Sequence, residues 1–428
     1  MAARVSKNGR AANARRLKVA GMFAGIGGLE LGLQRAGHET AYLCEIDEGA
    51  RAVLAHHFDG CRITEDVRAP HDLDASFDLL TAGFPCQDLS PAGGTRGIKG
   101  SRSRLVEEVL GLLERQPIPW VLIENVPFML KLDGGAAINL ITKRLERIGY
   151  RWAYRVLDSQ GFGVPQRRLR VFLLASLDGD PREVLLSESH QPVQASYALD
   201  EAAHGFYWTE GNRGVGWAEN AIPALKGGSG FFIPSPPAVL LTDGNVVTPT
   251  IDAAEKLQGF PGGWTRPAVK NGHARRRWTY VGNAVTVNVA RWIGERLAFP
   301  KSYDAQKDIE WKRNQPWPNA AWFDGHIRAV ANTSIWAREY KRKDLEDFLV
   351  GSYTPLSGRA TAGFLSRLEA SRLRASDDFK RALIRHIENI GAMDTLSALR
   401  AKRQLIISNE TAATCPSSTS MSALQELT

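Results

Sequence analysis

Apolar runs and amphipathic helical segments alternate from Lys18 to Ala175, and this alternation restricts the fold more than any other feature of the sequence. Strands are expected at residues 19–23, 41–46, 77–84, 120–126, 151–158 and 169–175, and helices at residues 29–35, 48–58, 105–114 and 136–148. Such alternation is typical of a sheet with helices on both faces. We therefore predict an α/β fold with a mostly parallel, doubly wound, Rossmann-like sheet in residues 18–176.

The pattern changes after this sheet domain. Residues 177–250 are rich in Gly, Pro, Ser and aromatic residues without a helical period, which indicates a small, loop-rich second lobe. Residues 251–298 regain helical periodicity and return to the sheet domain. Residues 299–407 are expected to form a largely helical C-terminal extension. We interpret residues 1–17 as a flexible basic arm and residues 408–428 as a disordered tail.

Composition narrows the class of protein further. The 54 Lys and Arg residues exceed the 46 Asp and Glu residues, and a net charge of +8 is compatible with a polyanionic partner such as nucleic acid. No apolar run approaches the roughly 20 residues of a membrane span. The four cysteines are too scattered for a disulfide framework or a zinc site. These scattered cysteines indicate a reducing, cytoplasmic location. His56 and His57 lack a partner at metal-ligand spacing, so we predict no metal.

Polar residues fall where strands of the predicted sheet end, which is where ligands bind in such sheets. The first strand runs into Gly25-Ile26-Gly27-Gly28, where backbone can approach a ligand closely. The third glycine of a dinucleotide fingerprint is absent, which argues against a pyrophosphate. Glu45 follows about 20 residues later, where a carboxylate holds ribose hydroxyls, and Asp66 follows the third short element. A nucleoside-bearing cofactor is predicted, the alternative being ordinary turn residues.

Cys86 is the candidate nucleophile. It follows Gly83-Phe84-Pro85 at a strand end, and Glu124 ends a neighbouring strand, so a carboxyl group can face the thiol across the sheet edge. A lone cysteine is more often a small core residue, but this context favours a thiol and acid pair. Alternation along the last strand places Arg168 and Arg170 on one side, where both can converge on an anion or a base.

These motifs together make the chain resemble the DNA (cytosine-5)-methyltransferases of bacterial type. The matching stretches, in the order of the family, are Phe23–Gly28, Glu45–Asp47, Gly83–Gln87, Glu124–Val126, Gln166–Arg170, Leu257–Pro261 and Gly282–Val285. They span about two thirds of the chain. The resemblance implies S-adenosylmethionine as methyl donor, duplex DNA as substrate, and target recognition by the lobe at residues 177–250.

The resemblance also implies roles for individual residues. Cys86 would attack C6 of a flipped-out cytosine, Glu124 would protonate N3, Arg168 would hold the base carbonyl and orient Glu124, and Arg170 would support the same site. The loop at residues 91–104 would close over the base. The implied cofactor contacts are Phe23, Gly25, Gly27, Glu45, Ile46, Asp66, Val67, Pro85, Leu105, Asn283 and Val285, and the implied DNA contacts are Gln87, Ser90, Arg96, Lys99 and Arg102.

Three functions fit this resemblance to different degrees. The favoured one is a monomeric bacterial DNA methylase in the nucleoid, either with a cognate restriction endonuclease that acts separately or as a solitary relative. An RNA cytosine methyltransferase fits less well, since Phe84 stands where those relatives tend to have proline. An inactive DNA-binding regulator is disfavoured because Cys86, Glu124 and Arg168 are intact.

Two features depart from the family pattern. The segment Thr248–Glu255 replaces a Pro-Arg-Glu-like sequence that braces the recognition lobe. Residues 299–428 have no counterpart in members that end soon after the last motif. The extension either packs against the rest of the protein or contacts DNA phosphates. The basic residues that would make such contacts are Arg367, Arg372, Arg374, Lys380, Arg381 and Arg385.

Overall fold

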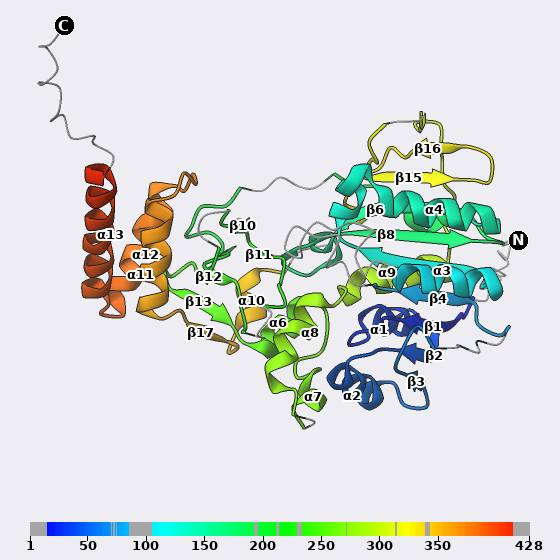
Figure 1. The fold of residues 1–428 in the computed structure, drawn as a ribbon, viewed down its shortest axis with the longest axis horizontal. Coiled ribbons are helices and arrows are strands. Elements are labelled where there is room, and N and C mark those ends of the chain that lie inside the picture. The colour runs from blue at the N-terminus through cyan, green and yellow to red at the C-terminus, as the bar shows by residue number, and fades with distance from the viewer. Residues whose placement is uncertain are drawn as a thin grey trace, which may run out of the picture.

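The protein has a large lobe built on a ten-stranded sheet and a second lobe that ends in a group of helices (Figure 1). The computed structural model describes residues 15–69, 71, 73, 75–84, 105–191, 196–210, 214–228, 233–270, 272–312, 315–338 and 343–413, with side chains up to Gln404. No helix in these ranges is both long and apolar enough to cross a membrane.

Half of the large sheet is parallel and half is antiparallel. The parallel half contains, in spatial order, β3 (Arg62–Thr64), β2 (Glu39–Cys44), β1 (Lys18–Met22), β4 (Leu79–Ala82) and β5 (Trp120–Asn125). It continues as antiparallel β8 (Leu169–Ser176), β6 (Arg151–Asp158), β15 (Ala320–Phe323), β16 (Arg328–Val330) and β14 (Ile309–Glu310). The expected mixed α/β architecture is confirmed, although the sheet is less parallel than predicted.

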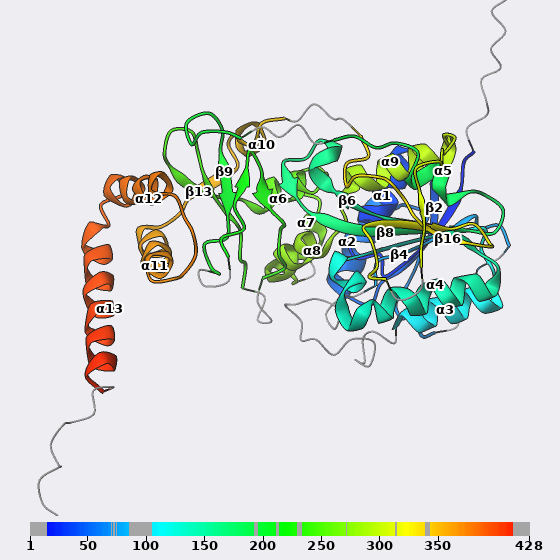
Figure 2. The ribbon, with the colours of Figure 1, turned by 90° about the horizontal axis from the view of Figure 1, so that it is seen from above.

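Helices cover both faces of this sheet (Figure 2). On one face, α3 (Leu105–Arg115) and α4 (Ala136–Ile148) bury their leucine and isoleucine stripes against the strands. On the other face lie α1 (Gly28–Arg35), α5 (Pro181–Leu185) and α9 (Val287–Ala298). Because both faces of each strand are buried, successive residues are apolar, and this gives the continuous apolar runs in the sequence from which the strands are predicted. The two helix layers leave the carboxyl ends of the parallel strands uncovered, and a cavity lies there.

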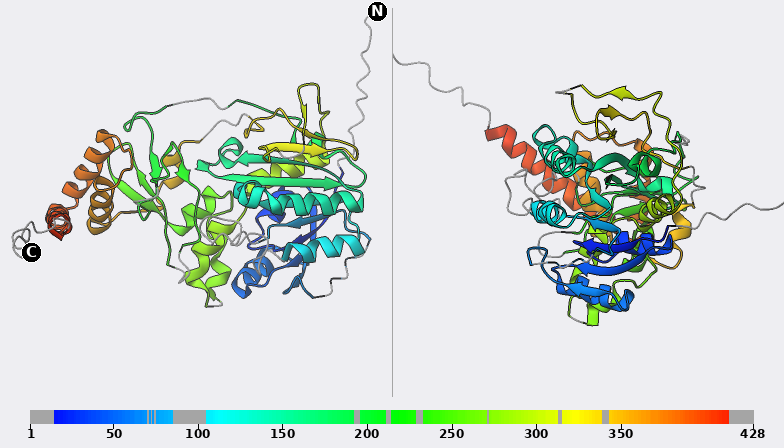
Figure 3. Two further views of the ribbon diagram at one scale, coloured as in Figure 1. Left: turned by 45° about the horizontal axis from the view of Figure 1, so that its top comes forward. Right: turned by 90° about the vertical axis from the view of Figure 1, so that its right-hand side faces the viewer.

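The first part of the extension belongs to the large sheet and contains strands. β15 pairs antiparallel with β6, so that Ala321 lies opposite Tyr154 (Figure 3). The fully buried Arg155 of β6 holds the following segment, since its guanidinium donates to the carbonyl oxygens of Ser334 and Trp336 at 2.8 and 3.1 Å. Residues 309–338 therefore extend the large sheet, whereas the sequence predicted a largely helical extension from residue 299.

The second lobe combines two distant parts of the chain. Its antiparallel sheet contains, in spatial order, β10 (Ala218–Glu219), β9 (His204–Phe206), β12 (Ala238–Leu240), β13 (Val246–Pro249) and β17 (Tyr353–Pro355). The helices α11 (Gly358–Glu369), α12 (Asp377–Asn389) and α13 (Met393–Ala413) pack against that sheet. The buried His386 of α12 accepts from Val246 N and contacts the carbonyl oxygen of Leu356 through its two ring nitrogens. The C-terminal residues therefore complete the core of this lobe.

Several basic residues of the extension are engaged within the lobe. Arg367 donates to the carbonyl oxygen of Trp208 at 2.9 Å, and Lys380 and Arg381 pair with Asp377 and Asp378 on their own helix. These contacts support the packing alternative. Contact with DNA stays a prediction for the exposed Arg372, Arg374 and Arg385.

Replacing Phe364 by Ala is expected to destabilise the second lobe. Phe364 is fully buried and its ring lies 5.2 Å from that of Phe206, so truncation leaves a cavity that should cost about 3–5 kcal/mol. Denaturant unfolding followed by tryptophan fluorescence measures this loss. Phe299→Ala is the matched control, because Phe299 is 49% exposed and should change stability by less than about 0.5 kcal/mol. Equal effects of the two substitutions would contradict the packing described here.

Four further helices connect the lobes. They are α2 (Glu48–His57), α6 (Ile251–Leu257), α7 (Arg266–Lys270) and α8 (Arg277–Asn283), and they share one apolar cluster with α10 (Leu345–Leu349). The buried Glu255 of α6 replaces the family's brace. Its carboxylate accepts from the amide of Thr265 at 2.9 Å and pairs with Arg277 at 3.1 Å. The segment that departs from the family pattern is therefore firmly packed.

Candidate active site

A cavity of about 580 Å³ opens at the carboxyl ends of β1, β2, β4 and β5. Ligand pockets for cofactor-sized molecules have volumes of about 300–1,000 Å³. The predicted cofactor residues in its wall are Phe23, Gly25, Glu45, Ile46, Asp66, Val67, Leu105, Asn283 and Val285. Residues from five separate segments thus meet in one place, at the edge where the parallel strands end.

The turn after β1 forms the floor of the cavity. Phe23 has a φ of 54°, a left-handed conformation that is uncommon for a residue with a side chain and that occurs preferentially at functional sites. Gly25 has a φ of 56°, and a Cβ built there would meet no atom within 4 Å, so its backbone lies open to a ligand. Gly27 is the N-cap of α1, and a Cβ built there would meet Phe58. It does not line the cavity, and its contact with the cofactor stays a prediction.

Glu45 is held at the cavity edge by backbone amides. Its Oε2 accepts from Gly25 N and its Oε1 from Asp47 N, both at 2.8 Å. Burial raises the pKa of Glu45, and these hydrogen bonds oppose that effect. Each carboxylate oxygen keeps a lone pair for a further donor, as a ribose ligand requires. Asp66 differs from Glu45 in its partner, because its carboxylate forms an ion pair with the side chain of Arg68.

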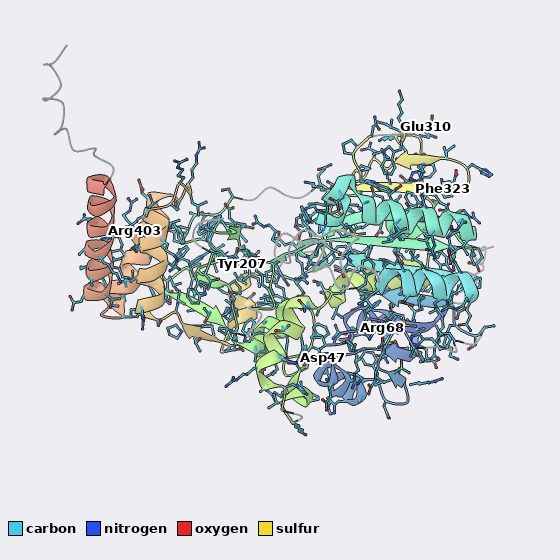
Figure 4. All side chains as sticks on the ribbon, viewed as in Figure 1. Asp47, Arg68, Tyr207, Glu310, Phe323 and Arg403 are labelled. Carbon is cyan, nitrogen blue, oxygen red and sulfur yellow. The ribbon has the colours of Figure 1, made fainter. Side chains whose placement is uncertain are left out.

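Asp47, which the sequence analysis did not assign to the site, connects α2 to α8. Its carboxylate caps α2 at Ala50 N and accepts from the Tyr280 hydroxyl at 2.6 Å, while Arg276 pairs with it at 2.5 Å. Figure 4 labels Asp47 and Arg68, which both line the cavity in the large lobe, and Tyr207 in the second lobe. Asp47 thus fixes α8, which supplies Asn283. The signal in the sequence was a capping residue two positions after Glu45.

Glu124 is the buried acid of the site. It is the next-to-last residue of β5, is 8% exposed, and pairs with Arg170, whose Nε lies 3.0 Å from Glu124 Oε1. Burial raises the pKa of Glu124, and the charges of Arg170 and Arg168 oppose the increase. The next residue, Asn125, donates to the carbonyl oxygen of Phe84 at 3.3 Å. Asn125 therefore ties the end of β5 to Phe84 at the end of the β4 segment, a role that sequence reasoning missed.

Arg168 does not lie where the sequence placed it. It falls between β7 (Gln166–Arg167) and β8, so the strand alternation is interrupted, and Arg168 is 1% exposed. Its guanidinium donates to the carbonyl oxygens of Leu225, Gly282 and Ala284 at 2.9–3.1 Å. Arg168 thus joins the second lobe to α8, and Arg170 is the arginine that forms an ion pair with Glu124.

This arrangement predicts different consequences for the two arginines. Arg168→Ala leaves three buried carbonyl groups without their charged donor and should lower the free energy of unfolding by about 3–5 kcal/mol. Arg170→Ala should instead lower kcat about a hundredfold while unfolding changes little. Denaturation curves and single-turnover rates separate the two effects. A stable, inactive Arg168→Ala variant would return Arg168 to the base-binding role.

The remaining predicted site residues lie outside the described residues. They are Pro85, Cys86, Gln87, Ser90, Arg96, Lys99 and Arg102. Among the residues that the structure does describe, no three His, Cys, Asp or Glu side chains form a group that could hold a metal ion. The expected absence of a metal stays a prediction.

The fold and cavity define a Rossmann-like α/β enzyme with a nucleoside-sized site, and comparisons with known proteins identify its family. Residues 17–204 match the C-5 cytosine-specific DNA methylase family. Type II methyltransferase M2.BsuMI of Bacillus subtilis (strain 168) is 45% identical over 383 residues, which cover 86% of this chain and 98% of that protein. Type II methyltransferase M.NlaX of Neisseria lactamica is 30% identical over 310 residues, which cover 65% and 96%.

A solved structure agrees at the level of the fold. The crystal structure of S. pombe Dnmt2 methyltransferase superposes with a TM-score of 0.50 at 19% sequence identity, covering 66% of this chain and 98% of that one. The chain belongs to the C-5 cytosine-specific DNA methylase family. It is a DNA (cytosine-5)-methyltransferase, and its family uses S-adenosylmethionine as the methyl donor.

Proposed function

We propose that this enzyme methylates C5 of a flipped-out cytosine within a specific duplex DNA sequence and that Cys86 is its nucleophile. The observation that carries this proposal is the buried Glu124–Arg170 pair, which lies in the cofactor cavity directly beside the end of β4. Because Asn125 binds the carbonyl oxygen of Phe84, the chain entering Pro85-Cys86 starts next to that acid. A nucleophile, an acid and a methyl donor would then share one compartment.

The residues of the chain suit this chemistry. Bound S-adenosylmethionine would supply an electrophilic methyl group. The Cys86 thiolate would bond to C6 of cytosine, which makes C5 nucleophilic. Glu124, with its raised pKa, would hold a proton at N3 while negative charge develops on the ring. Arg170 would fix the carboxyl orientation. After transfer, loss of the C5 proton and expulsion of the thiolate would restore the aromatic ring.

The cavity fits the proposed cofactor. The open backbone at Gly25 allows close approach, and Glu45 offers two oriented oxygens for a ribose diol. Phe23, Ile46 and Val285 give apolar walls suited to an adenine ring and a methionine chain. These features support S-adenosylmethionine and require no metal.

Replacing Glu45 by Ala is expected to weaken S-adenosylmethionine binding by about tenfold to a hundredfold. Hydrogen bonds to a charged acceptor contribute about 1.5–3 kcal/mol, which corresponds to that change in Kd. Isothermal titration calorimetry measures it. Glu39→Ala is the matched control, because Glu39 begins the same strand in an exposed position. An unchanged Kd for Glu45→Ala would remove Glu45 from the cofactor site.

The cellular role follows from the relatives. The Bacillus subtilis and Neisseria lactamica proteins are type II methyltransferases, which supports a restriction–modification methylase with a separately acting cognate endonuclease. We propose that the enzyme works as a monomer on chromosomal DNA in the bacterial cytoplasm. Expression in a host without cytosine methylation, followed by conversion sequencing, tests activity and target together. 5-Methylcytosine at one recurring sequence is expected, and an unmethylated genome with folded protein present would contradict the proposal.

A further inference from the structure

Glu30 is a buried acid that the proposed chemistry leaves without a role. It lies on the face of α1 that packs on the sheet, is 1% exposed and forms part of the cavity wall. Its Oε1 accepts from the Thr81 hydroxyl at 2.7 Å, whereas its Oε2 has no hydrogen-bond partner among the described residues. Burying a carboxyl oxygen without a partner costs free energy. A cationic ligand in the cavity would offset this cost through its charge.

The cavity carries more negative than positive charge. Six acidic residues line it, and four of them pair with arginines: Glu124 with Arg170, Asp47 with Arg276, Asp66 with Arg68, and Glu65 with Arg51. Within the described part of the chain, Glu30 and Glu45 form no ion pair. Glu45 is neutralised in part by backbone amides, but Glu30 has only the Thr81 hydroxyl. Uncompensated negative charge in a closed site favours a cationic ligand.

We propose that Glu30 is a cofactor-binding residue that favours the sulfonium cation of S-adenosylmethionine over the neutral thioether of S-adenosylhomocysteine. The inference rests on the proposed function, since it takes S-adenosylmethionine as the cofactor. Methyl transfer removes the positive charge from the sulfur. A negative Glu30 therefore loses its attraction for the cofactor when the product forms, which favours exchange of product for fresh methyl donor.

The preference for S-adenosylmethionine should depend on pH, because the carboxyl group of Glu30 loses its proton at a higher pH than an ordinary glutamate. Burial raises the pKa of Glu30 to about 7, the charge of Glu45 raises it further, and the hydrogen bond from Thr81 opposes both. The other titratable group facing Glu30 is Cys61, whose pKa is raised to about 12 by burial and by Glu30, so it stays neutral. Gly21, Leu43 and Thr81 pack against Glu30 without charge. Glu30 thus gains its charge between about pH 6 and about pH 8.

The test compares the affinities of the full-length protein for the two ligands. Kd is measured by calorimetry for S-adenosylmethionine and S-adenosylhomocysteine between about pH 6 and about pH 8.5. For the wild type, the preference for S-adenosylmethionine should rise about tenfold across this range relative to Glu30→Gln. Comparison with the variant cancels any titration of the ligands themselves. Glu65→Gln is the matched control, because it removes a charge from the exposed rim of the same cavity and should keep the wild-type pH dependence.

Each outcome decides the matter. One outcome is a Glu30→Gln variant that binds both ligands more weakly by the same factor and keeps the wild-type pH dependence of the ratio of the two Kd values. That result would overturn the inference and leave Glu30 a structural role. If that variant does not fold, Thr81→Ala replaces it: loss of the Thr81 hydrogen bond should shift the midpoint of the ratio to higher pH, and an unshifted midpoint also overturns the inference. Failure of the wild type to bind either ligand would instead refute the proposed cofactor itself.

Discussion

Cys86→Ala is expected to abolish methyl transfer while S-adenosylmethionine still binds with an affinity close to that of the wild type. C5 of cytosine becomes nucleophilic only after a thiolate has bonded to C6, and no other group replaces that bond. The described wall of the cofactor cavity is formed by other residues, among them Gly25 and Glu45. Transfer of a labelled methyl group to DNA and calorimetric cofactor binding measure the two properties separately. A loss of at least about 10⁴-fold in kcat is expected.

A covalent trap makes the same test in the wild type. In duplex DNA that contains 5-fluorocytosine, the C5 substituent cannot leave as a proton, so the enzyme should stay bonded to the base through Cys86 and survive denaturing electrophoresis. Cys415→Ala is the matched control, since Cys415 belongs to the C-terminal tail and should leave trapping intact. Appreciable methylation by Cys86→Ala would refute the proposed mechanism.

The cofactor side of the site could be predicted from the sequence because its geometry follows from the local chain. Glu45 and Glu124 each end a strand of a parallel group, and the carboxyl ends of such strands meet at one edge. Any chain with this alternation and these end residues brings them together. Glu45 and Glu124 could therefore be placed without knowledge of distant packing, whereas the buried setting of Glu30 depends on Thr81, 51 residues away in the chain.

The position of Arg168 could not be predicted because the strand is interrupted locally. Arg168 and Arg170 would share one side only in a continuous strand, but β7 and β8 are separated at Arg168 itself. Its backbone instead bonds to β6 and the turn after it, since Arg168 N donates to Asp158 and Arg168 O accepts from Ser159. One residue out of register exchanges a side chain between the cavity and the interior. Sequence periodicity does not detect such an interruption.

The extension could not be predicted because its partners are far away in the chain. β15 pairs with β6, and β17 pairs with β13. Each strand has few residues, and a short strand has no period that indicates its partner. The second lobe therefore looked small and loop-rich, although its core is completed by side chains such as Phe364 and Leu383. The helical periodicity of α11 and α12 could be recognised in the sequence, but the sheet that these helices cover could not be predicted.

Glu124→Gln is expected to lower kcat by about 10²–10⁴-fold, the usual contribution of a positioned general acid. The amide keeps the size of the side chain, so cofactor affinity and folding should change little. It cannot donate an acidic proton to N3, and it no longer forms the ion pair with Arg170. Glu107→Gln on the exposed side of α3 is the matched control and should retain full activity.

The pH dependence distinguishes this role from a purely structural one. Because burial raises the pKa of Glu124, the carboxyl group stays protonated to higher pH than an ordinary glutamate and loses its proton as the pH rises further. Single-turnover rates of the wild type should therefore fall on the alkaline side of that pKa, and the Glu124→Gln profile should lack this decline. Arg170→Ala removes the cation that holds the pKa down, so its decline should move to higher pH. A Glu124→Gln variant with the wild-type rate and the wild-type profile would exclude Glu124 as the proton donor.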